Sequence, residues 1–238
     1  MPWFNKIPSR RVLSTKQAQT VISDRTLAGS WVPQKVNMRN YWPLNGALTD
    51  SIGSLNLSMS SGSPSYVTGK VTGTQAITFS GSNWASTGSN FGITGSPNRT
   101  LMCWTKVSSS HTADPGSLCD WGSVSNTGRL FYITPSTGAT GKFSCWTFIA
   151  DVRSTITSAD NTWHHIAATF DGTIVRLYVD AVASGTYTYT LNSSDSPFHV
   201  GREQAINSLL KGSVQEIGYW TVALSASEIT QIYDTQRG

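Results

Sequence analysis

The stretch from Asn161 to Asp180 constrains the fold of this 238-residue chain more than any other. It reads NTWHHIAATFDGTIVRLYVD. Side chains of a strand alternate between two faces, so His164 and His165 are expected to point in opposite directions. Asp171-Gly172 then separates two alternating runs, which is a strong signal for a β-hairpin. The apolar face of this hairpin needs a second layer to cover it, so the rest of the chain is predicted to supply more strands.

The composition agrees with a β protein. Charged residues make up only 13% of the chain and hydrophobic residues 38%, so Ser, Thr, Asn and Gly must form much of the surface. From residue 40 onward, turn-forming clusters recur every eight to twelve residues or so, as is typical of a sandwich or barrel. The chain contains no run of about eighteen apolar residues, so no membrane-spanning helix is predicted. The first residues also lack the apolar stretch of a secretory signal.

The predicted fold class is all-β: a two-sheet antiparallel jelly-roll sandwich at residues 40–238, with an extended N-terminal arm at residues 1–39. We expect strands at Tyr41–Leu44, Leu55–Met59, Ala76–Phe79, Thr100–Val107, Leu118–Trp121, Arg129–Ile133, Lys142–Ile149, Ser154–Ile156, Tyr187–Leu191, Phe198–Gly201 and Ser213–Thr221, besides the hairpin. Gly88–Asn98 is expected to be a loop, because it contains Gly, Ser and Pro.

One short helix is predicted near the end of the chain. Ser225 and Glu228 have the spacing of a capping box, which predicts a helix from about Ala226 to Asp234. Its apolar side chains, at helical spacing, should pack on the sandwich. They are Ile229, Ile232 and Tyr233.

The arm carries most of the positive charge. Residues 1–40 contain seven Lys or Arg and one acidic residue, whereas the remainder of the chain is slightly acidic. The basic residues are too widely spaced for a polybasic nucleic-acid tail, so we expect the arm to bind a protein surface, where aromatic and Arg side chains dominate the energetics. The expected contacts are Trp3, Phe4, Arg10, Arg11 and Trp31.

The three cysteines, Cys103, Cys119 and Cys145, are expected to be small buried hydrophobic residues with free thiols. An odd number without a C-x-x-C motif gives no sign of a metal site. One disulfide with a spare thiol is the alternative.

The order of motifs from residue 40 onward resembles a known superfamily. The motifs are YWPLNGALTDSIGS, AITFSGSNW, RTLMCWTKV, the hairpin, SPFHVGR and LLKGSVQEIGYWTVALSASEI. They resemble the laminin-G-like, concanavalin A-like jelly-roll superfamily in its pentraxin-like branch. The resemblance implies two antiparallel sheets in which strands from distant parts of the chain pair. The superfamily includes lectins, glycosidase accessory modules, adhesion domains and shell components of bacterial viruses, so the fold leaves the function open.

Catalysis and metal binding are not expected. Related glucanases carry Glu-x-Asp-x-x-Glu on one strand, whereas here Glu216 has no second carboxylate beside it, as glycoside hydrolysis requires. The resemblance also implies calcium ligands at the positions of Ser80 and Gln215, and both are uncharged here. No cofactor is therefore predicted. A structural calcium held by Asp50, Glu216 and backbone carbonyls is the alternative.

Glycan contacts would come from exposed aromatic residues beside polar groups. Trp84 and Trp121 are the candidates, since turn residues flank them, and Tyr187 and Tyr189 lie on a half-polar strand. Packing within the core or against a sheet is the alternative for each. His164 and His165 cannot chelate one ion from opposite faces and are expected to pack or hydrogen-bond within a sheet. His111 and His199 have no evident partner.

These features favour a non-enzymatic structural protein of a bacterial virus. The arm would fasten the body to a major capsid or other virion protein, as in a capsid decoration or cement protein or a head or tail fibre. Such a protein would be made in the host cytoplasm, would lie on the virion surface, and would join a symmetric assembly or homo-oligomer. The alternative function is a carbohydrate-binding or adhesion module with a glycan as its partner.

Overall fold

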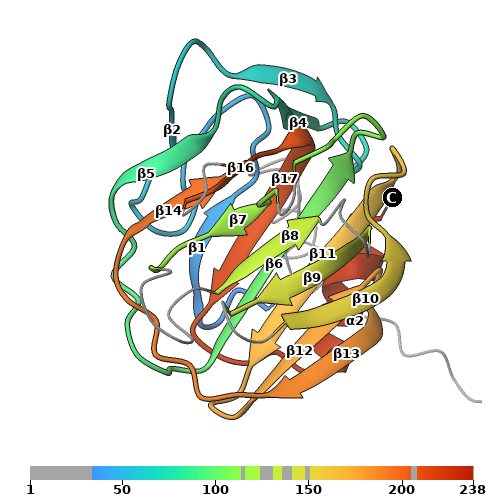
Figure 1. Cartoon of the computed structure of the whole chain (residues 1–238). Coiled ribbons are helices and arrows are strands. Elements are labelled where there is room, and N and C mark those ends of the chain that lie inside the picture. The colour runs from blue at the N-terminus through green and yellow to red at the C-terminus, as the bar shows by residue number, and fades with distance from the viewer. Residues whose placement is uncertain are drawn as a thin grey trace, which may run out of the picture.

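The computed structural model describes residues 34–113, 116–123, 131–135, 141–147, 151–204 and 208–237. These residues form two antiparallel sheets stacked face to face and one helix, which confirms the predicted fold class (Figure 1). The arm residues Trp3, Phe4, Arg10, Arg11 and Trp31 lie outside the described residues. No helix of the described part is long and apolar enough to cross a membrane.

The back sheet in Figure 1 has eight strands. In spatial order they are β13 (Val182–Thr188), β12 (Ile174–Val179), β11 (Trp163–Phe170), β6 (Arg99–Val107), β17 (Lys211–Trp220), β4 (Gln75–Ser80) and β3 (Ser65–Thr68), and β1 (Met38–Trp42) also pairs with β17. The central strand β6 thus lies between two strands that are distant from it in sequence.

The front sheet, toward the viewer in Figure 1, has seven strands. They are β10 (Asp151–Thr157), β9 (Lys142–Trp146), β8 (Tyr132–Pro135), β7 (Cys119–Asp120), β14 (Pro197–Val200), β5 (Ala85–Asn90) and β2 (Ser58–Met59). A small separate pair joins β15 (Arg202–Glu203) to β16 (Ser208–Leu209).

The hairpin is present as predicted. Strands β11 and β12 pair from Ile166↔Val179 to Phe170↔Val175. Asp171 stabilises the turn by accepting hydrogen bonds from the backbone N–H groups of Thr173 and Ile174 at 3.0 and 2.8 Å. The chain then turns back through Asp180 and Ala181, both at positive φ, which is the geometry of a tight two-residue hairpin turn.

Several predicted strand boundaries differ from the structure, and in two of these cases pairing between strands decided the conformation. Part of the expected loop Gly88–Asn98 belongs to β5, whose polar backbone pairs with β14 and β2. The strand expected at Tyr187–Leu191 is instead β13, which ends at Thr188 and begins directly after the Asp180–Ala181 turn. Local composition favours a loop in the first case, and pairing with neighbouring strands overrides it.

The main core fills the space between the sheets, and one end of it is aromatic. The Trp42 and Phe198 rings stack with centroids 4.9 Å apart, and Phe91 lies 4.9 Å from Phe198 and from Tyr219. Cys103, Cys119 and Cys145 are buried in this core as free thiols, as predicted. Burial raises the pKa of the Cys119 and Cys145 thiols, which keeps them protonated.

Helix α2 (Ala226–Gln236) packs on the outer face of the back sheet and forms a second, smaller core. The predicted capping box is confirmed, and the helix ends two residues later than expected. Ile229 and Ile232 are buried, and the Tyr233 ring stacks on Trp104 with centroids 5.5 Å apart. The helix therefore covers outward-facing side chains of β6, β11 and β12 and leaves part of the outer face of the back sheet open.

Candidate functional site: a groove on the back sheet

Beyond helix α2, one row of side chains crosses four strands on the outer face of the back sheet. Trp163 of β11 is paired with Lys106 of β6, Lys106 with Ser213 of β17, and Ser213 with Thr78 of β4. Directly paired residues of antiparallel strands project on the same face. These four side chains therefore form one continuous band across the sheet.

This band forms the floor of a groove of about 510 Å³. The described residues that line it are Val67, Thr68, Thr78, Phe79, Ser80, Lys106, Ser108, Asn161, Trp163, Lys211, Gly212 and Ser213. Most carry a hydroxyl, an amide or an ammonium group, and Trp163 adds a half-buried aromatic ring. We refer to this site as the groove.

Strand alternation explains why the groove lies here. Outward positions of β6 are Met102, Trp104 and Lys106, and the first two are buried in contact with the helix side of the sheet. Lys106 lies past the part of the sheet that the helix covers and is half-buried. Gly212 lets β17 approach β6 closely, since an added Cβ would lie 2.7 Å from the Lys106 carbonyl oxygen.

Hydrogen bonds within the protein fix the positions of the polar residues of the groove. Ser213 donates a hydrogen bond from its hydroxyl to Thr78 Oγ1 at 3.1 Å. Asn161 has a positive φ of 62° and donates its backbone N–H to the Val107 carbonyl oxygen at 3.0 Å, which leaves its exposed side chain at the rim. An apolar ring beside fixed hydroxyls and an amide is a surface suited to a polyhydroxylated ligand.

Sequence reasoning did not identify this site. Trp163 was noted only as a strand residue, and Lys106, Asn161 and Ser213 were not singled out. The available signal was a lysine near the end of the strand RTLMCWTKV, whose centre is apolar. What that signal lacked was the register that pairs Lys106 with Trp163 and Ser213.

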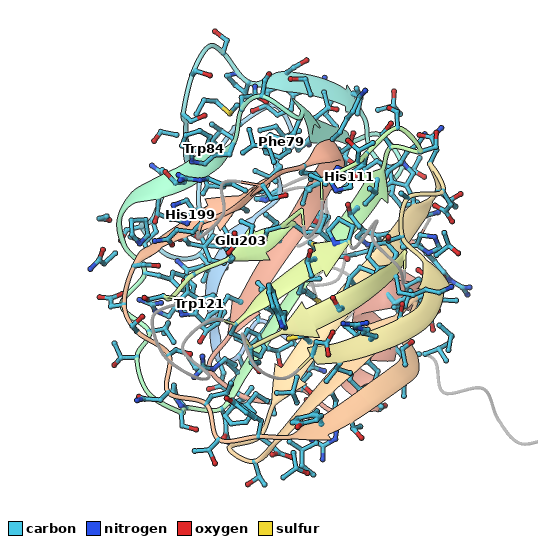
Figure 2. The ribbon with its side chains drawn as sticks, viewed as in Figure 1. Phe79, Trp84, His111, Trp121, His199 and Glu203 are labelled. Atoms are coloured by element: carbon cyan, nitrogen blue, oxygen red, sulfur yellow. The ribbon has the colours of Figure 1, made fainter. Side chains whose placement is uncertain are left out.

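Trp84, a predicted glycan contact, lies half-buried just before β5 and is not among the described residues that line the groove. The Arg202 guanidinium lies over its ring, 4.4 Å from the centroid. Figure 2 places Trp84 near His199 and Glu203 in the upper part of the front sheet. One face of the Trp84 ring is therefore already occupied by a side chain of the protein.

Trp121, the other predicted contact, lies in the main core and is fully buried. Its ring packs edge-on against Tyr219 at 5.5 Å and Phe91 at 5.1 Å. A glycan cannot reach a ring in this position, so Trp121 is not part of the candidate site. The flanking residues Asp120 and Gly122, which suggested exposure, are themselves buried.

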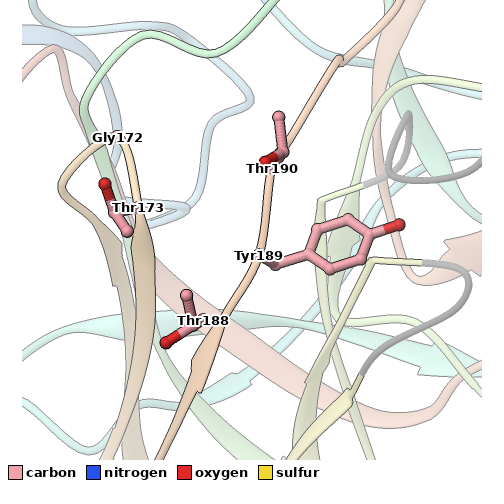
Figure 3. A pocket seen from close by; sticks show the side chains of 5 residues that line it. All are labelled: Gly172, Thr173, Thr188, Tyr189 and Thr190. Atoms are coloured by element: carbon pink, nitrogen blue, oxygen red, sulfur yellow. The ribbon is translucent and has the colours of Figure 1, made fainter.

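Tyr187 and Tyr189 are brought together, with ring centroids 6.1 Å apart. Tyr189 borders a second pocket, of about 410 Å³, that Gly172, Thr173, Thr188 and Thr190 also line. Figure 3 shows that the Tyr189 ring points away from Gly172 and Thr173. The threonines of this pocket therefore have no aromatic ring facing them, and the groove combines more of the features of a binding site.

A buried polar cluster, missed in the sequence, lies at the outer side of the front sheet. His199 Nδ1 lies 3.2 Å from Asp120 Oδ1, and the Gln204 backbone N–H donates to Asp120 Oδ2 at 2.9 Å. Burial raises the pKa of Asp120, against the opposing effects of His199, Gln204 and Arg202. Asp120 and His199 are separated by 79 positions along the chain and meet because β7 pairs with β14.

The carboxylates considered for calcium are used within the fold. Asp50 accepts hydrogen bonds from Asn40 Nδ2 at 2.6 Å and from four backbone N–H groups at 2.9 to 3.2 Å. Glu216 lies in a bulge at positive φ and accepts a hydrogen bond from the Tyr41 hydroxyl. Gln215 accepts from the Lys70 N–H at 2.5 Å, and Ser80 Oγ lies 2.8 Å from Ser82 Oγ.

Among the described residues, no three His, Cys, Asp or Glu side chains lie close enough together to hold a metal ion.

The two adjacent histidines lie in opposite environments, as strand alternation predicts. His164 lies between Asp180 and Asp160, with ring nitrogens 2.7 and 3.1 Å from their carboxylate oxygens. Burial lowers the pKa of His164, but these two carboxylates outweigh it and the net pKa is raised. His165 is fully buried, and burial lowers its pKa to about 4.

A known protein family and several solved structures agree with this architecture. Residues 72–230 match the concanavalin A-like lectin/glucanases superfamily, which is more than half of the chain. No curated protein sequence matches the chain.

Solved structures share the fold at low sequence identity. Domain 4 of AbnA, a GH43 extracellular arabinanase from Geobacillus stearothermophilus in complex with arabinotriose, is 16% identical with a TM-score of 0.68, over 83% of this chain and 98% of that chain. The binding domain of Paraclostridial Mosquitocidal Protein 1 is 16% identical with a TM-score of 0.64, over 83% of this chain and 52% of that chain.

The ligand binding domain of botulinum neurotoxin serotype D, in complex with N-acetylneuraminic acid, is 13% identical with a TM-score of 0.61, over 84% of this chain and 51% of that chain. This chain thus spans about half the length of the two toxin domains. On its sequence match and its two-sheet sandwich, the chain belongs to the concanavalin A-like lectin/glucanase superfamily.

Proposed function

We propose that this protein is a carbohydrate-binding module and that the groove on the back sheet is its glycan-binding surface. The observation that carries the proposal is the row of Trp163, Lys106, Ser213 and Thr78 across four paired strands. An indole ring supplies a flat apolar face for the C–H groups of a sugar ring. The hydroxyl, amide and ammonium groups around it supply hydrogen bonds to sugar hydroxyls.

The chemistry of the groove favours binding over hydrolysis. Glycoside hydrolysis uses two carboxyl groups on either side of the scissile bond. None of the described residues that line the groove is Asp or Glu. Asp120 is buried in the front sheet, and Glu203 is buried in the separate β15–β16 pair. A bound saccharide would therefore meet hydrogen-bonding groups without an acid–base pair.

The structural neighbours support the same proposal by analogy. One was solved with arabinotriose and another with N-acetylneuraminic acid, and both share this fold. They support a glycan ligand for this fold without specifying which sugar this chain takes. The virion hypothesis receives no such support: neither the family nor these neighbours indicates a capsid protein as partner.

The proposal is tested by measuring glycan binding of the full chain and of a Trp163→Ala variant. A saccharide array selects ligands, and calorimetry then measures their affinity. Loss of the ring should weaken binding at least about five-fold, because an aromatic contact of this kind contributes on the order of 1 kcal/mol or more. Trp163→Phe should keep part of the affinity.

Trp84→Ala is the matched control, since it removes an indole ring of similar exposure outside the groove. Unchanged thermal unfolding of Trp163→Ala would show that the fold is intact. Equal affinity of the wild type and Trp163→Ala, or loss of binding in Trp84→Ala alone, would place the glycan elsewhere and refute the groove as the site.

A further inference from the structure

The described residues that line the groove carry positive charge and no negative charge. Lys106 and Lys211 both line it, and no acidic side chain appears among its described lining residues. In the described part of the chain, ion pairs form between Arg or His and Asp, and neither of these lysines takes part in one. The groove therefore holds two positive charges without an internal counter-ion among the described groups.

The two ammonium groups arise from neighbouring strands on the same face. Lys106 is opposite Ser213 of β17, and Lys211 lies two residues before Ser213 on that strand. Diagonal neighbours of this kind have a separation of roughly 7–8 Å between their backbone positions, which long side chains can bridge. Lys106 and Lys211 can therefore direct both ammonium groups at one anionic group, beside the Trp163 ring.

Two other lysines of the described chain, Lys70 and Lys142, are placed differently. Lys70 donates to the Arg237 carbonyl oxygen at 2.7 Å and lies over the Trp104 ring, and Lys142 donates to the Thr155 carbonyl oxygen at 2.8 Å. These side chains have acceptors within the protein. The contrast indicates that the charges of the groove are available to a ligand.

We infer that the groove recognises an acidic saccharide, with Trp163 against a sugar ring and Lys106 and Lys211 on its carboxylate or sulfate. This inference rests on the proposed function and narrows its ligand class. Ammonium groups bind either anion as point charges, without the bidentate geometry of Arg. The shared requirement is a sugar ring that carries a negative charge.

The test compares acidic saccharides with neutral partners of the same ring structure. The probes are trigalacturonic acid and its methyl ester, sialyllactose and lactose, and a chondroitin sulfate tetrasaccharide and its desulfated form. Calorimetry with the full chain should show at least about ten-fold tighter binding for the charged member of at least one pair. The pair that discriminates tells whether the anion is a carboxylate or a sulfate.

Variants then assign the effect to the lysines. Lys106→Gln and Lys211→Gln should each weaken binding of the acidic probe about five-fold, the upper end for one solvent-exposed ion pair. Binding of the neutral probe should fall much less, because the Gln amide can still donate a hydrogen bond to a sugar hydroxyl. Lys142→Gln on the front sheet removes the same charge outside the groove and should change nothing. Added salt should weaken acidic binding in the wild type and much less in the double variant.

Each result decides a different claim. Equal affinity for charged and neutral members, with binding still dependent on Trp163, would overturn this inference and leave the proposed function standing. Binding to none of the probes or array saccharides would overturn both. A short oligothymidylate that binds as tightly as the acidic sugars, independently of Trp163, would also overturn the inference, because the groove would then attract any anion.

Discussion

Lowering the pH from 7 to about 5 should destabilise this protein through His165. The side chain is fully buried and packs against both the Trp104 and Tyr233 rings, whose centroids lie 5.3 and 5.8 Å from its own. Neither ring nitrogen has a hydrogen-bond partner among the described residues. Burial lowers the pKa of His165 to about 4, and the negative charge of Asp180 opposes this only in part.

The sign follows from proton binding in the two states. In the unfolded chain the pKa is about 6.5, so below this pH the unfolded state takes up a proton that folded His165 does not. The stabilisation is complete above about pH 6.5 and is lost progressively down to about pH 4. At pH 5 the loss amounts to about 2 kcal/mol, since each pKa unit is worth about 1.4 kcal/mol and protonation is then nearly complete in the unfolded chain.

His164 acts in the opposite direction and must be separated from this effect. Although burial alone lowers its pKa, Asp180 and Asp160 raise it above the unfolded value. Its contribution is therefore fully present below the unfolded pKa and is lost as the pH rises through the folded pKa. The wild-type pH dependence contains both histidines, whereas the difference between wild type and His165→Phe contains His165 alone.

The measurement is urea unfolding of wild type and His165→Phe at pH 7 and pH 5. The stability difference between the two proteins should change by about 2 kcal/mol between these pH values, whatever the phenylalanine itself costs. The histidine signals in an NMR titration provide an independent check. A pKa of His165 near 6.5, or parallel pH dependence of the two proteins, would refute the argument from burial.

Two further predictions concern structural hydrogen bonds. Ser225→Ala removes the cap of helix α2, where Ser225 Oγ accepts a hydrogen bond from the Glu228 N–H at 3.3 Å. The free energy of unfolding, measured by heat or urea, should fall by about 1 kcal/mol. An unchanged midpoint would show that the cap is dispensable. Gln215→Ala removes the side chain that accepts from the Lys70 N–H and donates to the Thr74 hydroxyl. The free energy of unfolding should fall by about 1–3 kcal/mol, and amide hydrogen exchange at Lys70 should become faster. Unchanged exchange at Lys70 would contradict the role of the Gln215 amide.

Function could be anticipated from the sequence only in outline. The motif order implied the superfamily, and the alternative function, a carbohydrate-binding module, is the one that the family and structural neighbours support. Trp121 illustrates why the site itself was missed. Its neighbours in sequence are turn residues, yet its ring is in the core, because the direction of one side chain at a strand end depends on the sheet behind it.

Features that depend on local spacing were determined by the sequence itself. The β11–β12 hairpin, the Ser225–Glu228 capping box, the opposite faces of His164 and His165 and the burial of the cysteines all follow from alternation, turn chemistry or hydrophobicity over a few residues. Such interactions form between groups that are already close along the chain, so the local sequence is sufficient to predict their geometry.

The tertiary structure decided everything that depends on the register between distant strands. Lys106, Trp163 and Ser213 meet because β6 lies between β11 and β17, and Asp120 meets His199 because β7 pairs with β14. A shift of one residue in either register would turn these side chains to the other face. Register is set by the packing of the whole core, so no local pattern in the chain specifies the groove.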